Sequence, residues 1–202
     1  MRTAAQRCTE FTTSLRFEDI PADVVEAAKY HLLDTLGCGL AAHALGVATE
    51  GRTVMAELGG DGQATVIGLD GGLPAPNAAF ANGMLCHGLD FDDTHSDSVS
   101  HVSVVTCPVA LAAGEAAGAS GREVLTAIVA GNEVVTRIGM AASGQFHKRG
   151  FHPTALCGIF GATAAAARLG GLDADAATSA LGLAGSMAWK RTLRRRSDGM
   201  ER

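Results

Sequence analysis

The sequence predicts an all-α fold, mainly helical throughout, and three observations support that prediction. Apolar residues recur at steps of three and four over long stretches, which is the period of a helix with one buried face. Strands and helices do not alternate, which disfavours a doubly wound α/β sheet. The chain also lacks a GxGxxG fingerprint and a P-loop lysine. With 202 residues, 47% hydrophobic and only 4% aromatic, we expect one helical domain, or one lobe of a larger protein, with a core of small aliphatic side chains.

The first half predicts three helices separated by glycine- and proline-rich breaks. Pro21 suits the first turn of a helix, because its missing N–H is not needed there. Gly59-Gly60 ends the second helix. Residues 62–68 (GQATVIG) indicate a short β-like run, and 69–76 (LDGGLPAP) indicate a turn-rich connector. The predicted helices are 21–43, 49–58 and 77–89.

The second half predicts four more helices. Ser120 followed by Glu123 is typical of a capping box at a helix start. Gly170-Gly171 ends one helix, and Asp173 is placed to cap the last. Residues 147–152 are predicted as a loop. The predicted helices are 102–117, 120–142, 153–169 and 173–187.

Net charge, cysteine use and hydropathy indicate which partners and which cellular compartment to expect. The net charge of −5 argues against nucleic acid as the main partner. Five cysteines are scattered without a CxxC pair, which indicates reduced thiols and a cytoplasmic protein. The start of the chain lacks the apolar segment of a signal peptide, and Asp34 and Glu115 interrupt the longest apolar runs. We therefore expect no membrane partner.

The last fourteen residues differ in composition from the rest. Residues 189–202 (WKRTLRRRSDGMER) contain six Lys or Arg and two acids. Three interpretations stay open: a disordered basic tail, a segment that is not native to the fold because of a premature stop or frameshift, and a nucleic-acid-binding arm. We place the helical domain at residues 1–188.

The run HGLDFDDTHSDSVSH, residues 87–101, has four aspartates and three histidines in fifteen residues. Such crowding of carboxylates costs stability unless cations, protons or hydrogen-bond donors offset it. The run fits a magnesium site loosely like that of isoprenoid diphosphate enzymes, although a second metal motif is missing. It also fits a zinc site through His95 and His101, or a metal-free acid/base site in which an aspartate orients a histidine.

A second motif, KRGFHPTALCG (residues 148–158), favours the acid/base interpretation. His152 precedes a predicted helix, and the helix dipole disfavours an imidazolium at that position. Helix N-terminal N–H groups favour a bound anion. Lys148 and Arg149 add positive charge suited to a carboxylate ligand.

With HGLDFDDTH, IVAGNEVVTRIG, GFHPTALCGIFGATAAAARLGGLD and ALGLAGSMA in this order, the chain resembles the N-terminal helical domain of the MmgE/PrpD family. That family includes 2-methylcitrate dehydratase, cis-aconitate decarboxylase and iminodisuccinate epimerase. The resemblance implies homodimers and chemistry without cofactor or metal on small di- or tricarboxylates. It implies a site lined by Asp90, Thr94, His101 and His152, with His95 as a competitor for the place of His101.

Full members of the family are more than twice as long as this chain and add a smaller α+β domain. After the GSMA segment they continue with a stretch containing lysine and histidine that completes the site. The resemblance therefore implies an incomplete site, and we expect little or no lyase activity from the 202 residues alone. A non-catalytic helical dimerisation module and a magnesium-dependent diphosphate enzyme remain as alternatives.

Overall fold

The protein is described from a computed structural model, which describes residues 2–188; the basic segment 189–202 lies outside the described residues. Helices dominate this part of the chain, joined by one 3₁₀ turn and one pair of very short strands. The helices are α1 (Ala4–Ser14), α2 (Ala22–Ala44), α3 (Glu50–Gly59), α4 (Ala75–His87), α5 (Ser103–Ala117), α6 (Gly121–Met140), α7 (Gln145–Lys148), α8 (Pro153–Leu169) and α9 (Ala174–Met187). The strands are β1 (Ala64–Thr65) and β2 (Gly72–Leu73), which pair antiparallel.

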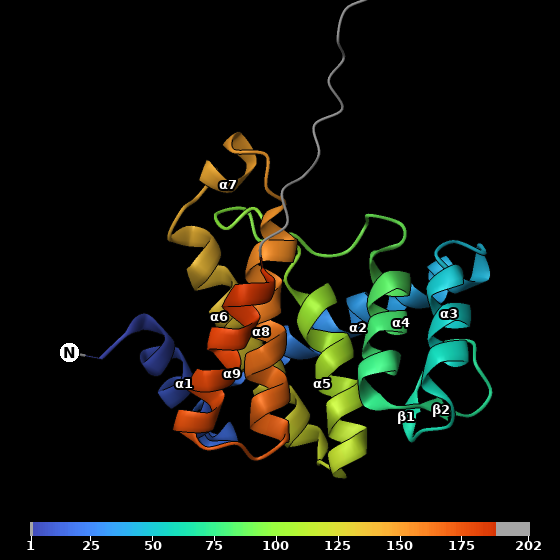
Figure 1. Cartoon of the computed structure of the whole chain (residues 1–202), viewed down its shortest axis with the longest axis horizontal. Coiled ribbons are helices and arrows are strands. Elements are labelled where there is room, and N and C mark those ends of the chain that lie inside the picture. The colour runs from blue at the N-terminus through green and yellow to red at the C-terminus, as the bar shows by residue number, and fades with distance from the viewer. Residues whose placement is uncertain (1, 189–202) are drawn as a thin grey trace, which may run out of the picture.

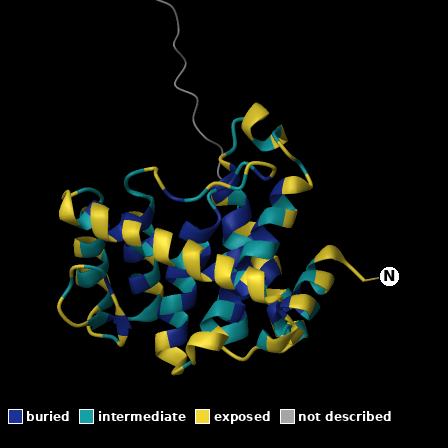
Figure 2. Cartoon of the chain, turned by 180° about the vertical axis from the view of Figure 1, so that it is seen from behind, coloured by how far each residue is buried: buried dark blue, intermediate teal, exposed yellow. Residues whose placement is uncertain are grey.

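The helices form a bundle with α6 and α8 side by side in one half, flanked by α1 and α9 (Figure 1). Helices α5 and α4 continue the bundle toward α3 and the β1–β2 pair at the far end (Figure 1). The long helix α2 crosses the back of the other helices and turns many exposed residues outward (Figure 2). The segment between α4 and α5 runs along one end of the bundle.

Small side chains build the centre of the bundle, as the low aromatic content predicts. One buried cluster joins α5, α6 and α8 through Cys107, Ile128 and Ala165. Glycines bring α6 and α8 still closer: a Cβ added at Gly161 would lie 2.6 Å from the carbonyl oxygen of Gly131. This close contact sets the position of α8 relative to α6. The first turn of α8 forms part of the candidate site.

The all-α prediction is confirmed, and all seven predicted helices are present with ends that differ by no more than two residues. The capping box of Ser120 and Glu123 and the cap by Asp173 are present as predicted. All five cysteines are free thiols, and four of them are buried. No helix within residues 2–188 is long and apolar enough to cross a membrane.

The sequence-based assignment was wrong in three places. Helix α1 was not predicted. The predicted loop 147–152 begins inside the short helix α7. The predicted connector 69–76 contains strand β2, which pairs with the β-like run through Ala64 and Leu73.

Candidate active site

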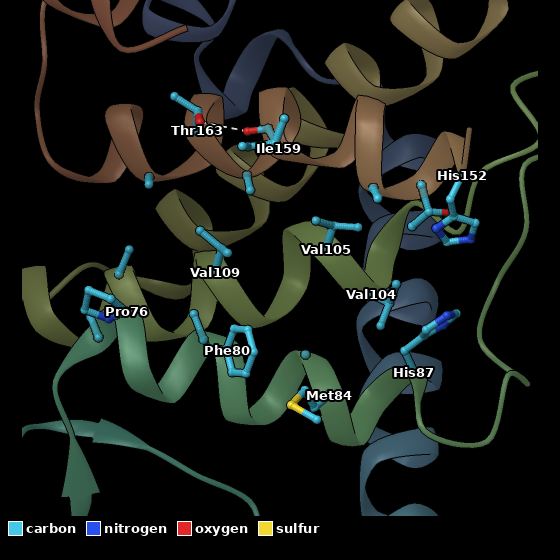
Figure 3. Close-up of a pocket in the computed structure, with 18 of the residues that line it drawn as sticks. Pro76, Phe80, Met84, His87, Val104, Val105, Val109, His152, Ile159 and Thr163 are labelled. Atoms are coloured by element: carbon cyan, nitrogen blue, oxygen red, sulfur yellow. Dashed lines mark hydrogen bonds between the residues drawn. The ribbon is translucent and has the colours of Figure 1, made fainter. Parts of the chain in front are cut away.

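A cavity of about 940 Å³ lies between α4, α5 and α8. Its walls are mostly apolar and include Phe80, Met84 and Val109. His87 from the end of α4 and His152 from the start of α8 lie near each other at one end of this cavity (Figure 3). Within the part of the chain that the structure describes, these are the two imidazoles of the lining, and both lie next to the segment that links α4 to α5.

Asp92 lies at the buried centre of that segment. Its side chain is fully buried, and its Oδ1 accepts a hydrogen bond from Nδ1 of His87 at 2.9 Å. Its Oδ2 lies 3.2 Å from Nδ1 of His101. One carboxylate therefore lies between two imidazoles, an arrangement that fixes ring orientation and tautomer.

His101 is held by groups on both sides of its ring. Nδ1 lies 3.3 Å from the Thr94 hydroxyl and 3.3 Å from the main-chain oxygen of Asp92. Nε2 lies 3.6 Å from Oδ1 of the exposed Asp90. The main-chain N–H of His101 donates to Oγ1 of Thr154 in α8 at 3.0 Å. These contacts bring the predicted residues Asp90, Thr94 and His101 together and tie them to the second motif.

His152 is the N-cap of α8 and stands just before Pro153. Its ring centroid lies 6.5 Å from that of His87, whose ring lies 5.0 Å from that of His101. Burial lowers the pKa of His152, and positive charge on His87, His101 and His147 would lower it further, while Asp90 opposes this. His152 therefore favours the neutral imidazole.

Sequence reasoning missed two members of this cluster. Both His87 and Asp92 lie within the run 87–101, but neither is among the predicted site residues. The available signal for His87 was its position as the last residue of the α4 helix, directly before the aspartates. Asp92 gave no such signal, because only the turn after α4 directs its side chain inward. Asp90 adopts a left-handed backbone with φ of 53° in this turn.

The other acids of the run have different roles. Asp93 accepts hydrogen bonds from the main-chain N–H and hydroxyl of Ser103, at the start of α5, and it pairs with His31 at 2.7 Å. Asp97 is exposed. His95, the competing candidate, bonds Ser98 within its own turn at 3.0 Å. The four aspartates do not converge, so the arrangement does not favour the diphosphate-type magnesium site.

Lys148 and Arg149 are exposed and do not line the cavity. No Lys or Arg is found among the lining residues in the described part of the chain. The first turn of α8 contributes Thr154 and Ala155 to the lining. Positive potential at this end therefore comes from the helix N-terminus, which favours anions.

Comparison with known proteins identifies the family of this chain. The family model described as the MmgE/PrpD N-terminal domain matches residues 6–200. The cis-aconitate decarboxylase-like protein oryM of Aspergillus oryzae is 33% identical over 91% of this chain and 40% of its own length. Cis-aconitate decarboxylase of Aspergillus terreus is 29% identical over 88% of this chain and 38% of its own length. The human cis-aconitate decarboxylase is 34% identical over 82% of this chain and 35% of its own length.

The chain thus spans about two fifths of the length of the curated relatives it matches. The family model covers the helical bundle together with both motifs of the site. The resemblance inferred from those two motifs is confirmed: the chain belongs to the MmgE/PrpD family, as its N-terminal domain.

Proposed function

We propose that this domain supplies acid/base groups to a lyase site that acts on a small di- or tricarboxylate. The observation that supports this is a cluster of imidazoles beside one end of an otherwise apolar cavity: Asp92 lies between His87 and His101, and the ring of His152 lies 6.5 Å from that of His87. The names of the relatives make cis-aconitate the first substrate to test, with decarboxylation as the reaction. Dehydration of 2-methylcitrate is the alternative within the same family.

Both reactions transfer a proton to or from a carbon atom that lies near a carboxylate. In the decarboxylation, the carbon–carboxylate bond breaks, CO₂ leaves, and the electron pair shifts through the adjacent double bond to a carbon that takes a proton. In the dehydration, a base removes a proton from carbon, and the leaving hydroxide departs as water after protonation. Imidazoles suit these transfers because their ordinary pKa is close to neutral pH.

The contacts divide the roles among the residues. Asp92 and Thr94 face Nδ1 of His101, which leaves Nε2 as the nitrogen for proton transfer and makes His101 the proposed proton donor. His152 stands at the N-terminus of α8, where the helix dipole disfavours an imidazolium, and it is the proposed acceptor. The first turn of α8 would bind a substrate carboxylate.

The test measures binding and turnover on the same sample. Cis-aconitate is titrated into the 202-residue chain while the histidine ring resonances are followed by NMR. We expect the signals of His87, His101 and His152 to shift, and His101→Gln and His152→Gln to weaken binding by about tenfold or more. His95→Gln is the matched control, because that imidazole bonds within its own turn, and it should bind like the parent.

Shifts confined to other histidines, or parental affinity in both site variants, would contradict the proposed site. Consumption of cis-aconitate or 2-methylcitrate is recorded in the same tubes. We propose that residues beyond this domain complete the site, so slow turnover is expected. Turnover comparable to that of a full-length relative would refute the proposed incompleteness.

The family resemblance implies homodimers, and we also propose that α2 supplies the surface through which the domain self-associates. Tyr30, Leu33 and Leu40 are 69%, 66% and 58% exposed and recur at helical spacing along α2. Exposed apolar stripes of this kind mark protein interfaces. Light scattering after size exclusion should give a dimer for the parent and a monomer for a Leu33→Asp/Leu40→Asp variant. A parent monomer, or an unchanged dimer in the variant, would refute this surface.

A further inference from the structure

We propose that Asp93 is a positioning residue for His101 and that His31 of α2 supports it in that role. The proposal rests on the proton-donor role proposed for His101, and it adds residues that do not touch the substrate. Asp93 is not among the residues that line the cavity. It acts through its two neighbours in the chain, Asp92 and Thr94.

The three consecutive side chains of residues 92–94 contact alternating partners. Oδ2 of Asp92 lies 3.2 Å from Nδ1 of His101, and the Thr94 hydroxyl lies 3.3 Å from the same nitrogen. The Asp93 carboxylate between them contacts α2 and the start of α5 instead. Such alternation is typical of an extended chain, in which residues i and i+2 lie on one side. Anchoring Asp93 therefore restrains both of its neighbours beside His101.

The first anchor of Asp93 is the start of α5. Its Oδ1 accepts a hydrogen bond from the main-chain N–H of Ser103 at 3.0 Å, and its Oδ2 accepts one from the Ser103 hydroxyl. The first N–H groups of a helix have no partner inside the helix, and the helix dipole favours a carboxylate there. The N-cap residue itself, Val102, has an apolar side chain that cannot accept such a bond. Ser103 follows His101 by two residues, so the bond to Asp93 joins the two parts of the chain that meet at His101.

The second anchor is His31, near the middle of α2. Nδ1 of His31 lies 2.7 Å from Oδ2 of Asp93. The Asp93 side chain is only 17% exposed, whereas that of His31 is 49% exposed. A carboxylate with so little access to water needs hydrogen-bond donors within the protein. Asp93 therefore joins α2 and α5 to the segment that carries Asp92 and Thr94.

The main test determines the tautomer of His101 in the free protein, so it needs neither substrate nor turnover. Long-range proton–nitrogen NMR of the 202-residue chain at pH 8 shows which ring nitrogen carries the proton. We expect the proton of the parent on Nδ1, the nitrogen that faces Asp92. Asp93→Ala should raise the population with the proton on Nε2 and weaken cis-aconitate binding by about two- to thirtyfold. Asp93→Asn keeps an oxygen acceptor for Ser103 and should restore most of both properties.

Two further variants separate positioning from a general loss of stability. Asp97→Ala removes an exposed carboxylate from the same segment and should leave the His101 tautomer and the binding unchanged. His31→Ala changes a half-exposed residue, and it should shift the tautomer in the same direction as Asp93→Ala even if the latter does not fold. Loss of a helix cap alone would lower the melting temperature and leave the His101 tautomer parental. That result in every folded site variant, or an equal tautomer change in Asp97→Ala, would overturn the proposal.

The two measurements also separate this proposal from the proposed function. If cis-aconitate does not shift the His101 signals of the parent, the proposed function fails, while a changed tautomer in Asp93→Ala still supports positioning. If the parent binds cis-aconitate at His101 but the tautomer and the affinity stay parental in Asp93→Ala and His31→Ala, positioning fails and the proposed function stands.

Discussion

The main-chain N–H of His101 donates a hydrogen bond to Oγ1 of Thr154 at 3.0 Å, across 53 residues of sequence. This bond joins the segment after α4 to the first turn of α8, and so it aligns the two motifs of the site. Thr154 is 7% exposed, so little water is available to replace its hydroxyl.

Thr154→Val should therefore destabilise the protein by about 1–3 kcal/mol, because it leaves a part-buried N–H without an acceptor. Urea denaturation measures the change in the free energy of unfolding. Thr154→Ser keeps the hydroxyl, so its free energy of unfolding should decrease clearly less. A loss in Thr154→Val no larger than that in Thr154→Ser would contradict a contribution from this bond, because valine keeps the γ-methyl and lacks only the hydroxyl.

The contact of α6 with α8 requires a glycine at residue 161. A Cβ there would collide with the side chain of Val135 and the main chain of Gly131. Overpacking of this kind costs about 1–3 kcal/mol, so Gly161→Ala should lower the melting temperature. Gly182 in α9 has open space around the same position, and Gly182→Ala should stabilise by up to about 1 kcal/mol. A thermal melt that ranks the two variants the other way would refute this packing argument.

Most of the helices could be predicted because their apolar periodicity and their caps agree. Helix α1 could not be predicted in this way. It contains several threonines, whose hydroxyls compete for backbone hydrogen bonds and so disfavour a helix. In the structure Thr9, Thr12 and Thr13 do bond main-chain oxygens within α1. Thr9 also contacts Thr178 of α9 at 2.7 Å, a tertiary contact that no local pattern reveals.

The sequence predicted the outline of the candidate site but not its central carboxylate, Asp92. Asp90, Thr94, His101 and His152 were predicted through motif resemblance, and in the structure Asp90 and Thr94 lie beside the ring of His101. The inward position of Asp92 depends on a turn with a left-handed residue before it, and composition does not encode that turn. The sequence therefore predicted which segments form the candidate site, and the structure shows the carboxylate that lies between His87 and His101.

The buried thiols should be inert in the folded protein. Burial raises the pKa of Cys86 and Cys107 to about 12 and that of Cys157 to about 11. At pH 8 a thiol with a pKa near 12 has about one molecule in ten thousand as the reactive thiolate. A disulfide reagent at this pH should label the partly exposed Cys8 first and the other four only in denaturant. Rapid labelling of two or more thiols under native conditions would contradict the described core.

The pKa of His152 should lie below the ordinary histidine value of about 6.5. Burial is the main cause, and repulsion by positive charge on His87, His101 and His147 adds to it. An NMR titration of the His152 ring measures this pKa. His87→Gln should raise it because a repelling charge is removed, whereas Asp90→Asn should lower it because an attracting charge is lost. Shifts in the opposite directions would refute the described arrangement.

The same lowered pKa makes stability depend on pH with a defined sign. Between the folded pKa of His152 and the unfolded value of about 6.5, the unfolded chain binds more protons than the folded one. The contribution of His152 is therefore fully present above pH 6.5 and is lost as the pH falls through that window. His152→Gln removes the titrating group, so its free energy of unfolding should decrease less than that of the parent between pH 7.5 and pH 5.5, as measured in urea. An equal decrease in both proteins would show that His152 has no shifted pKa in the folded state.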